Sequence, residues 1–376
     1  MTDRAEVLIV GAGIVGAACA AACAREGLRV TVVEGDLAPG MGATAAGMGH
    51  LVVMDDSEAQ FALTSVSARL WSALAPSLPD DCEAARCGTV WVAADEEELD
   101  AAAAKERYYR ARGREARVLD ARGLYALEPN LRPGLTGGLL VPDDALLYPP
   151  RAAAALLDRA VAAGARVVYG RRAVALGDGG VHLDDATVAR AERVVVASGA
   201  SVSELLPELS VRPRKGHLAI TERYPGVVRH QVVELGYLKS AHGAERESVA
   251  FNVQPRPTGQ LLIGSSRQYD VADAAVDAAI ARRMLARAAA YIPALRGLDA
   301  LRLWAGHRAA TPDGLPYVGP CPGREGVIVA AGHEGLGITT STGTAELVVD
   351  HLLGRRGELD PAPYLPSRAR IGAARA

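Results

Sequence analysis

The chain has 376 residues, of which 49% are apolar and 23% charged, as is typical of a soluble protein with one large or two ordinary domains. Its net charge of −3 argues against a nucleic-acid-binding protein, because such domains are usually basic. No apolar run reaches the roughly 18 residues that span a bilayer, and glycines interrupt the apolar stretch near the N-terminus. We therefore expect a cytoplasmic protein with no signal peptide and no membrane span.

Cysteine usage indicates neither a metal site nor a disulfide framework. The five cysteines are Cys19, Cys23, Cys82, Cys87 and Cys321. Their spacing matches no zinc or iron–sulfur pattern, and their number is odd. We expect reduced thiols and no bound metal.

The chain opens with a predicted strand–helix–strand unit. Residues 6–10 are an apolar run typical of a buried parallel strand. The motif Gly11-Ala-Gly-Ile-Val-Gly16 follows and leads into a small-residue helix that ends near Glu26. A second strand over 29–33 ends at Glu34.

Each glycine of this motif has a physical role in binding a dinucleotide. Gly11 makes the tight turn, Gly13 lets the backbone approach a pyrophosphate, and Gly16 allows close packing of helix and strand. Free N–H groups and the helix dipole then favour the diphosphate. Glu34 can accept hydrogen bonds from a ribose diol and would repel a 2′-phosphate. This unit predicts a dinucleotide but does not distinguish FAD from NAD.

Further elements follow in chain order. Expected helices cover 58–74, 95–113, 149–163, 272–291 and 339–353. Expected strands cover 87–93, 166–183 with a turn at 177–180, 193–199, most of 215–264, and 326–332. The strand over 326–332 runs into Gly332-His-Glu-Gly-Leu-Gly-Ile338, so a second glycine-rich turn and helix start lie at the carboxyl edge of a parallel sheet. Two distant segments are therefore expected to build one cofactor site.

These motifs together resemble the D-amino-acid oxidase/glycine oxidase family of FAD-dependent oxidoreductases over nearly the whole chain. The resemblance rests on the Gly11–Gly16 motif with Glu34, Thr44-Ala-Ala-Gly-Met48, Val194-Val-Val-Ala-Ser-Gly199, Gly306-His-Arg308, Thr311-Pro-Asp-Gly-Leu-Pro-Tyr-Val-Gly319, and Gly332-His333 with Gly337. Within the family, residues 48–56 and 332–339 are most similar to the D-hydroxyproline dehydrogenase branch. Glycine oxidases differ in both segments.

The resemblance implies an α/β FAD-binding Rossmann-like domain interleaved with an α+β substrate domain built on a mainly antiparallel sheet. The FAD-binding domain is expected over 1–84, 141–212 and 300–366. The substrate domain is expected over 85–140 and 213–299, and 367–376 is expected to be a flexible tail.

The resemblance also implies an extended FAD. Its diphosphate would lie at Gly13–Gly16, its ribose at Glu34, and its adenine near Val174. Its flavin ring would lie between the segments 45–48 and 332–339, with amides at the start of the last helix facing the N1/O2 edge. The expected cofactor contacts are Gly11, Gly13, Ile14, Val15, Gly16, Glu34, Thr44, Ala45, Ala46, Gly47, Met48, Val174, Gly199, Gly332, Gly335, Leu336, Gly337, Ile338 and Thr339.

Arg308 matches the family's carboxylate-binding arginine, whose planar fork suits two parallel charge-assisted hydrogen bonds. His50 and His333 are candidates to form a hydrogen bond with a hydroxyl group on the ring of a cyclic substrate, or to shift the pKa of the substrate's amine. For His333 a structural role is favoured, and for His50 the two roles are equally weighted. Tyr237, with Lys239 and His242, lies on a segment expected to cover the pocket, although such residues are more often on the surface.

The expected reaction is oxidation of the carbon–nitrogen bond of a small amino or imino acid by hydride transfer to flavin N5. The first candidates are cis-4-hydroxy-D-proline and D-proline. A glycine, sarcosine or D-amino-acid oxidase using oxygen is an alternative, and a non-catalytic flavin-binding subunit is another. A nicotinamide-dependent dehydrogenase would need a second nucleotide motif. Electrons would pass to a partner subunit or a quinone, and a dehydrogenase is favoured over an oxidase.

Overall fold

The computed structural model describes residues 5–177, 179–236, 247–269 and 271–368. The chain divides into two compact units, each assembled from separate stretches of sequence. Unit 1 comprises Met1–Cys82, Tyr148–Pro213 and His307–Ala376, and unit 2 comprises Glu83–Leu147 and Arg214–Gly306.

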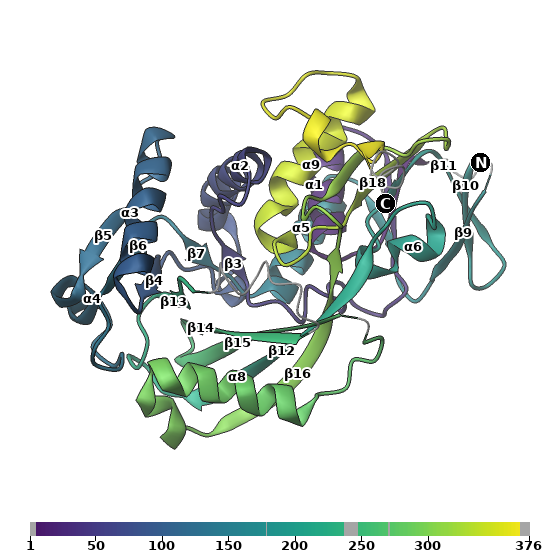
Figure 1. Cartoon of the computed structure of the whole chain (residues 1–376). Coiled ribbons are helices and arrows are strands. Elements are labelled where there is room, and N and C mark those ends of the chain that lie inside the picture. Colours follow the sequence, from purple (N-terminus) through teal and green to yellow (C-terminus); the bar gives the residue numbers. More distant parts are fainter. Residues whose placement is uncertain (1–4, 178, 237–246, 270, 369–376) are drawn as a thin grey trace. The chain divides into compact units, whose positions relative to one another are not determined.

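Unit 1 is built on a mostly parallel sheet (Figure 1). Its strands are β1 (Ala5–Val10), β2 (Val30–Val33), β8 (Arg166–Val168), β9 (Ala173–Gly177), β10 (Gly180–Leu183), β11 (Val188–Val196), β17 (Tyr317–Pro320) and β18 (Val327–Ala331). The order across the sheet is β17-β18-β11-β1-β2-β8, with the β9–β10 hairpin extending from β11. The pairs β18–β11, β11–β1, β1–β2 and β2–β8 are parallel. The carboxyl ends of these five strands therefore share one edge.

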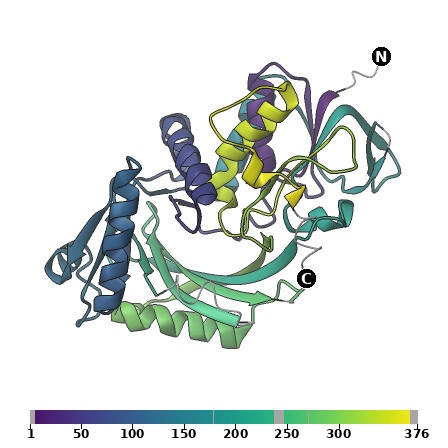
Figure 2. The same cartoon turned by 45° about the horizontal axis from the view of Figure 1, so that its top comes forward.

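The helices of unit 1 are α1 (Ile14–Arg25), α2 (Glu58–Leu74), α5 (Pro149–Ala162), α6 (Val202–Leu205) and α9 (Gly337–Leu353). Helix α1 packs against both α5 and α9, and α9 also packs against α2 (Figure 2). The sequence of α1 is almost entirely alanine, glycine, cysteine and valine, so neighbouring helices can approach it closely. Cys19 and Cys23 are both buried in this helix.

Unit 2 is built on a mainly antiparallel sheet of order β16-β12-β15-β14-β13-β4-β6-β5. Its strands are β4 (Thr89–Ala93), β5 (Arg117–Asp120), β6 (Gly137–Val141), β12 (Arg212–Arg223), β13 (Gln231–Glu234), β14 (Glu247–Pro255), β15 (Gln260–Tyr269) and β16 (Ala300–Ala310). Its helices are α3 (Glu96–Ala111), α4 (Ala121–Leu127) and α8 (Ala278–Tyr291). The short strands β3 (His50–Leu51) and β7 (Ala145–Leu146) belong to units 1 and 2 respectively.

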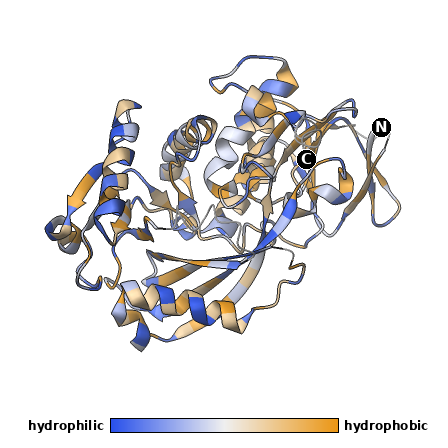
Figure 3. Cartoon of the chain, in the orientation of Figure 1, coloured by the Kyte–Doolittle hydropathy of each residue, from blue (hydrophilic) through white to orange (hydrophobic). Residues whose placement is uncertain are grey.

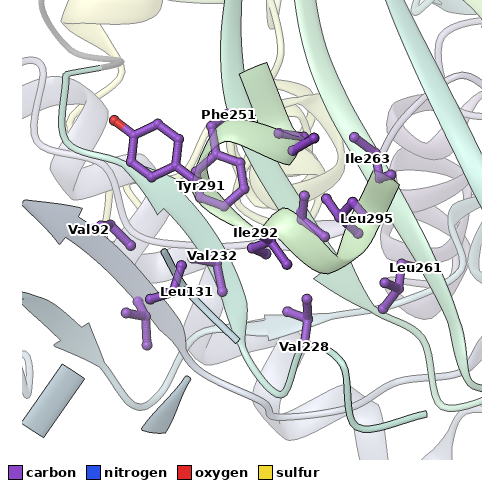
Figure 4. Close-up of a cluster of buried hydrophobic side chains, with 14 of the residues drawn as sticks. Val92, Leu131, Val228, Val232, Phe251, Leu261, Ile263, Tyr291, Ile292 and Leu295 are labelled. Atoms are coloured by element: carbon purple, nitrogen blue, oxygen red, sulfur yellow. The ribbon is translucent and has the colours of Figure 1, made fainter. Parts of the chain in front are cut away.

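The core of unit 2 lies between its sheet and α8 (Figure 4). The rings of Phe251 and Tyr291 stack there with their centroids 4.6 Å apart. Helix α8 carries both hydrophobic and hydrophilic residues (Figure 3), and its buried residues recur three or four positions apart, as expected of a helix with one buried face.

Several features differ from the sequence-based expectations. The helix expected over 272–291 begins only at Ala278, because Asp277 caps it by accepting hydrogen bonds from Ala279 N and Ile280 N. Residues 141–147 and 300–306 group with unit 2, since β6 and the first part of β16 belong to its sheet. The strands β5, β6, β16 and β17 and the short helices α4 and α6 were not among the expected elements. Within the described ranges, no helix has the length and apolar character needed to cross a membrane.

Candidate cofactor and substrate site

The turn after β1 shows why two glycines of the motif are needed for the fold. Gly11 has φ +102°, and a Cβ there would lie 2.7 Å from Ala197 O. A Cβ on Gly16 would lie 1.9 Å from Gly11 O. Both distances are far inside van der Waals contact, so the turn, the helix and the end of β11 can meet only without these side chains.

Gly13 is different, because nothing in its own fold requires a glycine. Its backbone is extended, with φ −63° and ψ 172°, a conformation that any residue can adopt. A Cβ there would contact only Thr44 Oγ1, at 3.5 Å. The open side of Gly13 is therefore available to a ligand rather than filled by protein.

Side chains from other segments hold the start of α1. Ile14 N donates a hydrogen bond to Thr44 Oγ1 at 3.0 Å, and Ala12 N donates to Glu34 Oε2 at 2.5 Å. The first N–H groups of a helix have no acceptor within it. The positive end of the α1 dipole therefore lies at the carboxyl edge of the sheet, where it favours a phosphate.

Glu34 is fixed at the end of β2. Its Oε1 accepts a hydrogen bond from Asp36 N at 2.9 Å, and its carbonyl oxygen accepts one from Arg171 N at 2.9 Å. The second bond ties the turn after β2 to the segment that leads into β9. Val174, the residue expected near adenine, lies on β9 and is half exposed.

The two glycine-rich segments expected to flank the flavin lie side by side in unit 1. A Cβ on Gly47 would lie 2.5 Å from Ile338 Cδ1. Thr339 Oγ1 donates a hydrogen bond to His50 O at 2.8 Å. A Cβ on Gly337 would be 3.9 Å from Val15 Cγ2, so the N-termini of α1 and α9 are neighbours.

Ser198, which lies just beyond the end of β11, indicates that the carboxyl edge of the sheet fits a polar ligand. Its Oγ is buried and has no hydrogen-bond partner among the described residues. The Cα of Ser198 lies 3.2 Å from where a Cβ of Gly11 would be. A buried hydroxyl without a partner is destabilising, so the phosphate loop fits a group that brings hydrogen-bond acceptors. A dinucleotide diphosphate is such a group.

Arg308 lies on β16 against the loop between β18 and α9. Its Cδ and Nε are each 3.6 Å from the position of a Cβ on Gly335. The next residue, Ala309, accepts a hydrogen bond from Glu334 N at 2.8 Å. Strand and loop are thus paired, and the Arg308 side chain passes over the glycine.

The two candidate histidines differ in their surroundings. The buried ring of His333, in the loop before α9, packs against that helix with Nε2 2.9 Å from Thr344 Oγ1. Burial lowers the pKa of this ring to about 3, so it is neutral at physiological pH. His50 is half buried on β3, and its carbonyl accepts the bond from Thr339. Tyr237, Lys239 and His242 lie outside the described residues.

Two residues next to the site were not among the sequence-based candidates. For Ser198, the only sequence signal was its place in an apolar strand that is followed by a glycine. Glu334 lies inside the recognised Gly332–Ile338 motif, but the position of its carboxylate depends on a backbone conformation that the sequence does not reveal.

Residues 6–351 match the family model described as DAO, FAD dependent oxidoreductase, and the chain belongs to this family. It is 31% identical to a glycine oxidase of Geobacillus kaustophilus, with 98% of each chain covered. The crystal structure of glycine oxidase from that organism has a TM-score of 0.88 at 30% identity, covering 98% of this chain and 99% of the other. A hydrogen cyanide synthase subunit HcnC of Pseudomonas aeruginosa is 28% identical, covering 98% of this chain and 97% of the relative.

The family confirms several expectations. The protein is an enzyme, it uses FAD, and its fold class is a Rossmann-like FAD-binding domain combined with a substrate domain. The resemblance to the D-hydroxyproline dehydrogenase branch and the individual site residues stay predictions.

Proposed function

We propose that this enzyme oxidises the carbon–nitrogen bond of a small amino or imino acid whose carboxylate is held by Arg308. The observation that carries the proposal is the position of Arg308 against Gly335, in the loop that leads into α9. Bound FAD supplies the two-electron acceptor for this oxidation.

The chain's own residues bind and orient the reactants in this proposal. The guanidinium of Arg308 offers two parallel N–H groups to a carboxylate, which fixes one end of the substrate. The phosphate loop, Glu34 and the 44–48 segment hold the cofactor. No side chain of the preceding residue caps α9, so its first amides can stabilise negative charge on the bound ring system.

Replacing Arg308 tests the proposal directly. Arg308→Leu should keep its FAD but lose on the order of 10²–10⁴ in kcat/KM for carboxylate substrates, because a shielded charged contact is lost. Arg308→Lys should restore only part of the activity, since lysine lacks the planar fork. Steady-state kinetics and the visible flavin absorbance measure the two properties separately.

Arg302→Leu is the matched control, because Arg302 lies on the same strand and its side chain is exposed. Its kcat/KM should equal that of the wild type. Wild-type kcat/KM in Arg308→Leu would remove Arg308 from the substrate site.

Two substrate classes are proposed, each with its own support. Glycine is favoured by full-length relatives that are named glycine oxidases. Cyclic imino acids, with cis-4-hydroxy-D-proline and D-proline first, are favoured by the resemblance of residues 48–56 and 332–339 to the hydroxyproline branch.

Anaerobic bleaching of the flavin distinguishes these classes. The panel contains glycine, sarcosine, D- and L-proline, the hydroxyproline epimers and small D-amino acids. Bleaching by glycine but by no cyclic substrate would reject the hydroxyproline assignment. Bleaching by none of the panel would reject the proposed function and point to a non-catalytic flavin subunit.

For the electron acceptor we propose a partner subunit or a quinone. One relative, which aligns with this chain over almost its whole length, is named as a subunit of hydrogen cyanide synthase. The relatives named oxidases make oxygen the competing acceptor. Rapid reoxidation of the reduced flavin by air, followed by stopped flow, would favour oxygen instead.

A further inference from the structure

Glu334 combines an uncommon backbone conformation with a carboxylate that is partly shielded from solvent. It lies in the loop between β18 and α9 with φ +52°, a left-handed conformation that is uncommon for residues other than glycine. Its carboxylate oxygen Oε1 is shielded from solvent. A left-handed backbone costs free energy and persists only where the surroundings enforce it. Such positions occur often at functional sites.

The loop turns this carboxylate toward Gly335. Glu334 Oε2 accepts a hydrogen bond from Gly335 N at 2.6 Å, and Glu334 N donates to Ala309 O at 2.8 Å. The Arg308 side chain passes 3.6 Å from the position of a Cβ on the same glycine. A cationic and an anionic side chain therefore flank one residue that has no side chain of its own.

These two charges are opposite in sign to the two ends of an α-amino acid zwitterion. We propose that Glu334 is a specificity-determining residue, which attracts the substrate's ammonium group while Arg308 holds its carboxylate. The other titratable side chain of this loop, His333, faces Thr344 and is neutral, so it does not compete for either end. The inference rests on the proposed function, and it adds that simple carboxylates and dicarboxylates are disfavoured by like-charge repulsion.

Glu334→Gln in the FAD-loaded enzyme tests this role with two ligands, one expected to bind more weakly to the variant and the other more tightly. The first is the amino acid that reduces the wild-type flavin best, and the second is acetate, which has a carboxylate but no ammonium group. For the amino acid, kcat/KM should fall about tenfold, mainly through KM, because an opposite charge is lost. The inhibition constant of acetate, checked by its perturbation of the flavin spectrum, should improve severalfold because a like charge is lost.

Two further variants make the result specific. Glu334→Asp should restore amino-acid discrimination, because aspartate keeps the charge and tolerates positive φ. Glu358→Gln, an equivalent change at an exposed residue paired with Arg69, should alter neither ligand. FAD content and melting temperature confirm that each variant is folded.

The outcomes separate this inference from the proposed function. If Glu334→Gln weakens both ligands together, Glu334 serves only to hold Arg308 in place, and the inference is wrong. Unchanged constants for both ligands would reject it as well. If no amino acid reduces the wild-type flavin, the proposed function itself fails.

Discussion

The imidazole of His333 links this single residue to the stability of the whole fold. Its folded pKa is about 3, against 6.5 for an ordinary histidine, because burial disfavours the charged ring. Unfolding exposes the ring, which then binds a proton at any pH below about 6.5. The neutral ring therefore makes its full contribution to the free energy of unfolding above pH 6.5, and this contribution is lost as pH falls toward 3.

Replacing His333 should make the free energy of unfolding less dependent on pH in the acid range. Between pH 7.5 and 5 the wild type should lose about 2 kcal/mol in free energy of unfolding from this group alone, and His333→Gln should not. Urea unfolding at both pH values measures the difference. His182→Gln is the control, because His182 is exposed on β10 and its loss should leave the wild-type dependence intact. An equal pH dependence in wild type and His333→Gln would show that the ring does not stay neutral in the fold.

At the scale of elements, the glycine motif combines two different requirements in one turn. A Cβ on Gly16 overlaps the backbone of Gly11, whereas a Cβ on Gly13 meets only Thr44 Oγ1 at 3.5 Å. Gly16→Ala should therefore prevent correct folding. Gly13→Val should leave a folded protein that has lost FAD, since its side chain occupies the approach of the pyrophosphate.

The ratio of visible flavin absorbance to protein absorbance and a thermal melt together test this contrast. Gly27→Ala serves as a control for a glycine outside the site, because a Cβ there meets nothing within 4 Å, although its φ of +81° predicts some loss of stability. A colourless but folded Gly16→Ala, or a Gly13→Val that keeps its FAD, would contradict the assignment.

The sequence predicts well the elements whose signals are local, and it predicts poorly those that depend on pairing with distant segments. The strands β1 and β18 are apolar runs that end just before Gly11 and Gly332, and both the apolar run and the glycine are local signals. The strand β16, which carries Arg308, contains Gly306 and several alanines and is poor in β-branched residues. Its partner is β12, roughly 80 residues earlier, so its hydrogen bonds come from a pairing that no local pattern reveals.

The site shows the same division. Glu34 could be predicted because it ends the strand after the glycine motif. The bond from Ile14 N to Thr44 Oγ1 joins residues 30 positions apart, and the carboxylate of Glu334 is placed by a left-handed backbone paired with Ala309. Such contacts depend on tertiary structure, which propensity and spacing do not encode.

At the scale of the whole molecule, each unit is assembled from separated stretches of chain. In unit 1, β1 pairs with β11, and β11 pairs with β18, so the sheet joins residues from the beginning, the middle and the last part of the sequence. Ion pairs on the surface repeat this pattern, with Arg25 2.8 Å from Glu346 and Arg355 2.9 Å from Glu26. The candidate cofactor site therefore depends on all three stretches of unit 1 and not on the first βαβ unit alone.

This arrangement has a consequence for the order of events during synthesis. Translation adds about 5–20 residues per second. The loop at 332–337 and helix α9, whose N-terminus neighbours that of α1, are made more than 300 residues after the phosphate loop. Until residues 332–353 have been translated, a nascent chain carries the phosphate loop without the helix start that neighbours it in the folded unit. We therefore expect FAD to be retained only by chains that include this segment.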